Sequence, residues 1–154
     1  MMNNQNHDNG NTSLVRTIFR ILLGAFLLFT GTGHLTFLRE EFLAQVPTWL
    51  PMDGDLVVVL SGIVELILGA ALILLPKNRA IIGWVAAAFF VAIFPGNLSQ
   101  YVNRIDAFGL NTDQSRFIRL FFQPVFVIWA LWSTGAWKAW RKRKSTAERN
   151  ESAS

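Results

Sequence analysis

Five polar residues lie inside long apolar stretches of this sequence, or at the ends of such stretches: His34, Glu65, Asn97, Arg119 and Gln123. A polar group in an apolar segment is costly to keep, so by default it indicates a function or a pairing partner. A carboxylate and an imidazole can take up and release a proton, whereas an arginine and side-chain amides can donate hydrogen bonds to a carbonyl oxygen. Together these types suit a small polar head group held in apolar surroundings.

Each of the five residues also has a purely structural interpretation. Glu65 can form an ion pair with Arg119 or with His34 and so fix the helices against each other. Asn97 and Gln123 can be interhelical hydrogen bonders, and Arg119 can extend towards the outer lipid headgroups. One histidine with one glutamate is too small a ligand set for a haem or metal site, so we predict no metal. The sequence has no self-contained catalytic set, which leaves Glu65 as the candidate proton-handling residue.

The elements that must position these residues are membrane helices. Of the 154 residues, 52% are hydrophobic and 16% are charged, against roughly a quarter charged in soluble domains. Crossing a bilayer core takes roughly 20 apolar residues in a helix. The sequence predicts four such spans, and therefore an all-α, polytopic bundle of four transmembrane helices, at residues 21–38, 56–75, 80–98 and 120–137.

These spans place all five polar residues in the outer half of the membrane. His34 and Asn97 come near the ends of the first and third spans, and Arg119 and Gln123 open the fourth. Glu65 lies nine residues into the second span, roughly 14 Å deep at the rise of an α-helix. Small residues lie on the same helix faces as the polar residues and permit close packing, so the polar groups should face the bundle interior. These small residues are Gly24 and Gly31 in the first span and Ser61, Gly62 and Gly69 in the second.

The distribution of positive charge predicts the orientation. Ten of the fourteen Lys and Arg residues fall on the side of the two termini, and Arg39, Arg104, Arg116 and Arg119 fall on the other. The richer side is expected to be cytoplasmic, with both termini inside. We predict a disordered tail at 1–14, a membrane domain at 15–140 and a basic tail at 141–154. The net charge of +4 is concentrated after the last span, so it indicates a membrane anchor and not nucleic-acid binding.

The connections carry further signals. In residues 39–55, Phe42, Val46 and Trp49 recur at helical spacing, which predicts a short amphipathic segment at the membrane surface. Asp53 or Asp55 can cap the second span. The connection at 76–79 is tight, so the second and third spans should be antiparallel neighbours.

Several motifs, in this order, resemble those of the DoxX-like family of small bacterial membrane proteins over about residues 15–137. They are Gly33-His34, Ser61-Gly62-Ile63-Val64-Glu65-Leu66, Phe94-Pro95-Gly96-Asn97 and Arg119-Leu120 followed by Gln123. The family often has proline after Arg-Leu, where this chain has Phe121. The resemblance implies a four-helix membrane bundle. The family takes its name from a subunit associated with a thiosulfate:quinone oxidoreductase, and distant animal relatives look like receptor-assembly chaperones.

We therefore predict an integral protein of the bacterial cytoplasmic (inner) membrane that binds a quinone or similar lipophilic molecule, as a subunit of a membrane oxidoreductase complex. Arg119, Gln123 and His34 would donate hydrogen bonds to a carbonyl, and Phe90 and Phe94 would form an apolar wall. No cofactor is built in; the expected partners are the lipid bilayer, a quinone, and an oxidoreductase chain or a second copy. The alternatives are a non-catalytic assembly factor or scaffold, and a small transporter.

Overall fold

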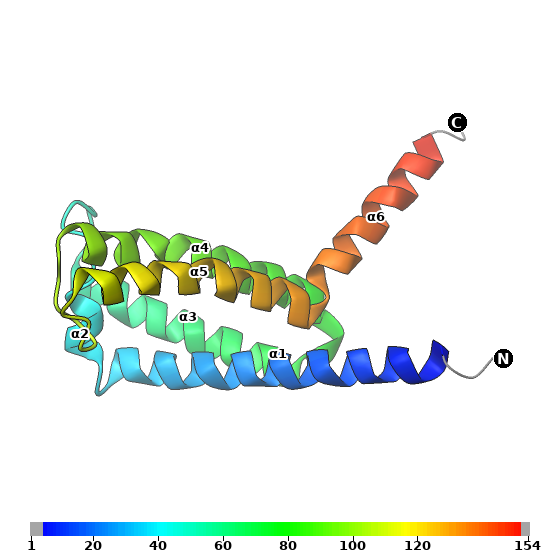
Figure 1. Cartoon of the computed structure of the whole chain (residues 1–154), viewed down its shortest axis with the longest axis horizontal. Helices are drawn as coiled ribbons and strands as arrows, with labels where there is room; N and C mark the ends of the chain where they lie inside the picture. The colour runs from blue at the N-terminus through cyan, green and yellow to red at the C-terminus, as the bar shows by residue number, and fades with distance from the viewer. Residues whose placement is uncertain (1–4, 152–154) are drawn as a thin grey trace.

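The computed structural model describes residues 5–151, and the side chains of residues 13–149. Over this range every regular element is a helix. The helices follow one another along the chain as shown in Figure 1: α1 (Gln5–Leu35), α2 (Arg39–Leu43), α3 (Gly54–Leu74), η1 (Pro76–Asn78), α4 (Arg79–Val102), α5 (Asp113–Thr134) and α6 (Ala136–Glu151).

Four segments are long and apolar enough to cross a membrane: Ser13–Leu35, Gly54–Leu74, Pro76–Val102 and Asp113–Thr134. They agree in number and order with the four predicted spans. Large apolar side chains cover their outer faces, for example Ile67 and Leu74, which are 63% and 72% exposed. Such a surface is unfavourable in water and favourable in lipid. The chain is therefore an all-α, multi-pass membrane protein.

Local hydrogen bonds explain where α3 and α5 begin. Asp53 is the N-cap of α3, and its carboxylate accepts a hydrogen bond from the backbone N–H of Leu56 at 3.0 Å, as the sequence suggested. Thr112 and Ser115 form a reciprocal capping box that starts α5 at Asp113, seven residues before the predicted span at 120–137. The span was predicted from its apolar residues alone, so it did not include the polar first turns of α5.

The two tails are helical over the described residues. We predicted a disordered tail at residues 1–14, but in the structure α1 begins at Gln5. Residues 1–4 of that predicted tail lie outside the described part of the chain. Extending a helix that the apolar span has nucleated costs much less than starting one, which accounts for this continuation. The basic tail belongs to α6, which follows Gly135, a left-handed residue with φ of 71°.

Helices α1 and α3 pack closely through their glycines. A Cβ atom added to Gly69 would lie 2.7 Å from the carbonyl oxygen of Gly24, and one added to Gly31 would lie 2.9 Å from that of Gly62. Any larger residue would separate the backbones, so the small-residue faces predicted for the first two spans form the contact between them.

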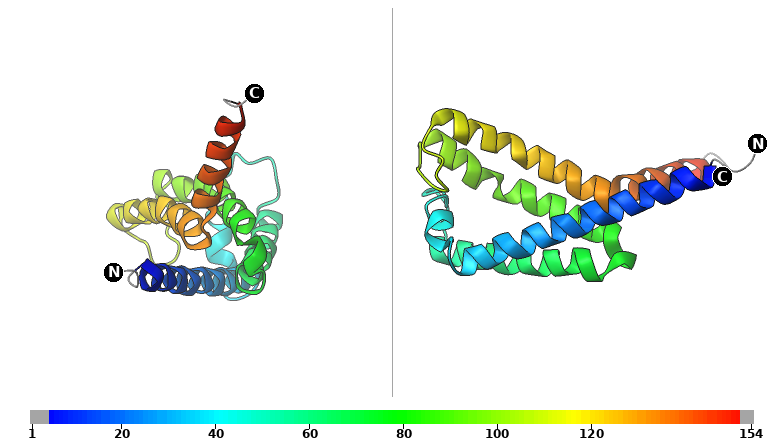
Figure 2. Two further views of the ribbon diagram at one scale, coloured as in Figure 1. Left: turned by 90° about the vertical axis from the view of Figure 1, so that its right-hand side faces the viewer. Right: turned by 60° about the horizontal axis from the view of Figure 1, so that its bottom comes forward.

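The second helix pair is α4 with α5, and the two pairs diverge at one end. In Figure 2 the α4–α5 pair lies apart from the α1–α3 pair at the end that carries α2, and approaches α1 towards the termini. The apolar core includes Leu23 and Leu27 of α1, Leu72 of α3, Ala86 of α4 and Ala130 of α5. At this end, near α2, residues from both pairs line a cavity.

Candidate functional site

A cavity of about 580 Å³ lies between the two helix pairs, near α2. All five polar residues singled out from the sequence line it, from four different helices: His34, Glu65, Asn97, Arg119 and Gln123. The rest of the wall is mainly apolar and aromatic. The structure thus gathers residues that are up to 89 positions apart in the sequence around one space.

His34 and Glu65 form the buried polar pair of this cavity. Nε2 of His34 lies 3.5 Å from Oε1 of Glu65, and the two residues are only 7% and 4% exposed. The second polar atom of each side chain, Nδ1 of His34 and Oε2 of Glu65, is buried without a hydrogen-bond partner. A buried polar atom normally has a partner, so this pair, whose residues line the cavity, keeps hydrogen-bonding capacity that the described protein does not use.

Arg119 does not pair with Glu65, which was one of the two pairings that the sequence suggested for this carboxylate. Its Nη2 donates a hydrogen bond to Oε1 of Gln45 at 3.2 Å, and its guanidinium lies 4.5 Å from the centre of the Phe108 ring. Among the described residues, Glu65 has its ion-pair contact with His34. Of the two pairings considered for Glu65, the structure therefore contains the one with His34.

Two phenylalanine rings connect the two polar ends of the cavity. The His34 ring stacks on Phe42, with centroids 3.4 Å apart, and Phe42 meets Phe108 edge-on at 4.7 Å. Phe108 in turn lies under Arg119. Phe42, predicted to belong to an amphipathic surface segment, thus faces inward and helps to cover the cavity.

Asn97 and Gln123 are occupied with each other and with the backbone. Nδ2 of Asn97 donates to Oε1 of Gln123 at 2.7 Å, and Nε2 of Gln123 donates to the carbonyl oxygen of Phe90 at 2.5 Å. This pair joins α4 to α5. These bonds use one donor and one acceptor site of Gln123 to connect α4 and α5, which fits its structural interpretation.

Aromatic rings from three helices form one wall of the cavity. Phe126 of α5 stacks between Phe26 of α1, at 5.0 Å, and Phe90 of α4, at 5.2 Å. Phe90 lines the cavity as predicted, but the prediction for Phe94 was wrong, because this residue is not part of the lining.

Two lining residues that the sequence did not single out, Gln45 and Phe108, are held by hydrogen bonds to residues behind them. Gln100, 1% exposed, accepts a hydrogen bond from Nε2 of Gln45 at 2.9 Å and donates to the carbonyl of Ala107 at 3.2 Å. The backbone N–H of Phe108 donates to Oε2 of Glu41 at 2.5 Å, and Phe108 has a left-handed φ of 57°. Gln100 follows Asn97 by three residues on the same helix face, which was a usable signal; Phe108 lies in an irregular loop and had none.

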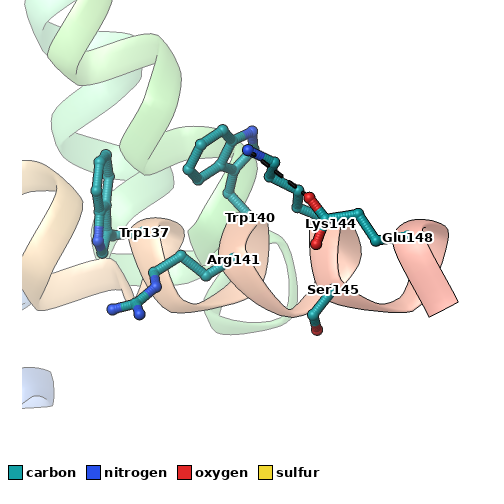
Figure 3. Close-up of a pocket in the computed structure, with 6 residues that line it drawn as sticks. All are labelled: Trp137, Trp140, Arg141, Lys144, Ser145 and Glu148. Carbon is teal, nitrogen blue, oxygen red and sulfur yellow. Dashed lines mark ion pairs between the residues drawn. The ribbon is translucent and has the colours of Figure 1, made fainter.

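A second, shallow hollow lies on α6, as Figure 3 shows. Trp137 and Trp140 lie on one side of it, with ring centroids 5.4 Å apart, and Nζ of Lys144 lies 3.9 Å from Oε1 of Glu148. All of its lining residues come from this one helix, so it does not enclose a small molecule. The cavity near α2 is the candidate site.

A model of one protein family matches residues 23–134, a range that contains all the residues of the candidate site described above. The family is described as a domain of unknown function (DUF8561). No curated protein and no solved structure matches the chain. Because the match covers well over half of the sequence and parts of all four membrane helices, this chain belongs to the DUF8561 family.

Proposed function

We propose that this membrane protein binds a small lipophilic molecule with a polar head, of the quinone class, in the cavity near α2. The observation that carries the proposal is the pair His34 and Glu65, which lines a largely apolar cavity and keeps one unpartnered polar atom on each side chain, Nδ1 and Oε2. A polar ligand atom at this position would remove the cost of leaving them unpaired.

The size and lining of the cavity suit such a ligand. Its volume of about 580 Å³ falls within the range of small-molecule sites, roughly 300 to 1,000 Å³. The stacked rings of Phe26, Phe126 and Phe90 offer a flat wall for an aromatic or quinonoid ring. Phe29 and Phe122, both lining the cavity, are more than half exposed, so an apolar tail can extend from the cavity into lipid.

Each polar residue of the cavity has a proposed role in binding this ligand. Arg119 and His34, at the two polar ends of the cavity, each bind and orient one carbonyl oxygen of the ligand, because both keep N–H or ring-nitrogen capacity beyond their protein partners. Glu65 holds or releases a proton at its carboxylate beside the imidazole. A quinone supplies two-electron, two-proton chemistry when bound. The electrons would come from a partner chain, and the resemblance to DoxX-like subunits supports a place in a membrane oxidoreductase complex.

Thermal melts of the purified chain in mild detergent test the proposal. A short-chain quinone should raise the melting temperature of the wild type; at a concentration 100 times Kd the stabilisation amounts to about 2.7 kcal/mol. Glu65→Gln, which keeps the shape of the side chain but cannot ionise, should fold normally and lose most of this shift. Gln114→Ala, at an exposed position of α5, is the matched control and should keep it.

A wild-type chain that neither copurifies with a lipophilic molecule nor responds to quinone would refute the proposal. It would favour the second candidate, a non-catalytic assembly factor. The observation in favour of that candidate is the bond from Asn97 to Gln123 and on to Phe90, which uses polar groups only to hold α4 against α5.

A further inference from the structure

Three arginines gather at the opposite end of the bundle, near the termini. Arg16 and Arg20 are one turn apart on α1, and Arg79 begins α4, seven residues after Leu72, whose carbonyl oxygen Arg20 contacts. None of the three forms an ion pair with any described side chain, from residue 13 to residue 149. Like charges repel, and the described part of the chain supplies no anion that would offset the repulsion among these three arginines.

Arg20 is the buried member of this cluster, with 5% of its surface exposed. Its Nη1 donates a hydrogen bond to the carbonyl oxygen of Leu72, in the last turn of α3. Its Nε is buried without a partner, as is Nε of Arg16. A guanidinium carries five N–H donors in a planar fork, so one carbonyl leaves most of its capacity unused.

A structural role for Arg20 alone explains only part of this arrangement. A cation near the C-terminus of α3 is stabilised by the helix dipole and by free carbonyls, which accounts for the bond to Leu72. It does not account for two unpartnered Nε atoms, or for the third arginine, Arg79, at the start of α4, seven residues after Leu72. Both features are favourable once an anion with several acceptor oxygens lies among the three guanidinium groups.

We propose that Arg16, Arg20 and Arg79 form a binding site for the headgroup phosphate of an anionic phospholipid. Arg16 and Arg20 fall within a membrane span, Ser13–Leu35, so the anion available to them is that of the surrounding lipid. Basic pockets between membrane helices bind such headgroups. Trp132, whose ring centre lies 5.8 Å from the Arg16 guanidinium and 5.5 Å from the Phe19 ring, provides an apolar wall for the acyl chains.

Helix α6 is a competing basic surface at the same end of the bundle. It carries five Lys and Arg residues between 138 and 144. Their side chains are exposed, and Lys144 is paired with Glu148 (Figure 3). A surface of this kind attracts anionic lipids diffusely, whereas the arginine site would depend on particular residues. Lys142 is therefore a matched control, because Lys142→Gln removes one positive charge from the same end without touching the arginine cluster.

Native mass spectrometry of the full chain in detergent, titrated with phosphatidylglycerol, tests the site. The wild type should bind it more tightly than phosphatidylcholine with the same acyl chains. Arg79→Gln and Arg16→Gln should each weaken phosphatidylglycerol binding about fivefold, the effect of one lost cation near a headgroup. Lys142→Gln should leave it unchanged. Arg79 is exposed, so its variant should fold normally even where an Arg20 variant does not.

Three results would each overturn the proposal. An equal loss in Lys142→Gln and Arg79→Gln would indicate a diffuse basic surface in place of a site. Equal binding of phosphatidylcholine would remove the need for an anion. Inorganic phosphate that binds as tightly as phosphatidylglycerol, with the same dependence on Arg79, would assign the cluster to a free anion and not to a lipid.

Discussion

Nε2 of His34 lies 3.5 Å from Oε1 of Glu65, across the contact between α1 and α3. The glycines of these helices make this proximity available, since a Cβ added to Gly62 would lie 2.8 Å from Cβ of His34. The pair thus depends on close backbone packing, and its remaining polar atoms, Nδ1 and Oε2, have no partner within the described protein.

A double-mutant cycle should reveal the energetic coupling of this pair. His34→Leu should destabilise the chain by about 3 kcal/mol, because removal of one partner leaves a buried carboxylate uncompensated. Adding Glu65→Leu should recover much of that loss, since replacing both partners of a buried pair by apolar residues is often near neutral. Unfolding free energies in detergent measure both effects. Losses that simply add would show that the two residues do not interact.

Arg119 should control how long a ligand stays in the cavity. Arg119→Met removes the hydrogen bond to Gln45 and the contact with the Phe108 ring, two residues that line the cavity beside Arg119. We expect quinone to dissociate about tenfold faster, the equivalent of about 1.4 kcal/mol. Arg104→Met, at an exposed loop residue, is the control for loss of a positive charge on the same side. Equal dissociation rates in the two variants would contradict this role for Arg119.

Gln123 should matter for stability and not for ligand binding. Gln123→Leu removes both the bond from Asn97 and the bond to the Phe90 carbonyl, so we expect a loss of about 0.6 to 2 kcal/mol, as for hydrogen bonds between membrane helices. The quinone-dependent shift in melting temperature should persist. If the shift disappears while stability is unchanged, Gln123 is a ligand contact, as the sequence first suggested.

The glycine contact between α1 and α3 should not tolerate a methyl group. Gly69→Ala places Cβ 2.7 Å from the Gly24 carbonyl oxygen, and we expect it to cost about 1 to 3 kcal/mol through overpacking. Gly96→Ala is the matched control, because its Cβ would come no closer than 3.4 Å to any neighbouring atom outside its own helix. Both changes raise helix propensity equally, so the difference between their melting temperatures isolates the clash. Similar melting temperatures would mean that the helices can move apart freely.

The orientation in the membrane is a prediction from charge alone. Reporter fusions after residues 78 and 154 should read cytoplasmic, and one after Asp113 should read external, because ten of the fourteen Lys and Arg residues lie on the first side. A cytoplasmic signal from the fusion at Asp113 would reverse the assignment.

The sequence by itself determined the number and order of the membrane helices and the faces on which α1 and α3 meet. These are local properties: the length of an apolar stretch, and glycines that recur on one helical face. It also predicted that His34, Glu65 and Arg119 belong to one region, because polar residues in lipid are confined to the bundle interior.

Only the tertiary structure decided which of these residues touch. The choice of His34 over Arg119 as the partner of Glu65 depends on how closely two helices approach and how each is rotated, to which distant residues contribute. The insertion of Phe108 between Phe42 and Arg119 depends on a loop with a left-handed residue, which no periodic pattern indicates. Helical periodicity fixes which face a residue occupies, whereas its partner is fixed by the packing of the whole bundle.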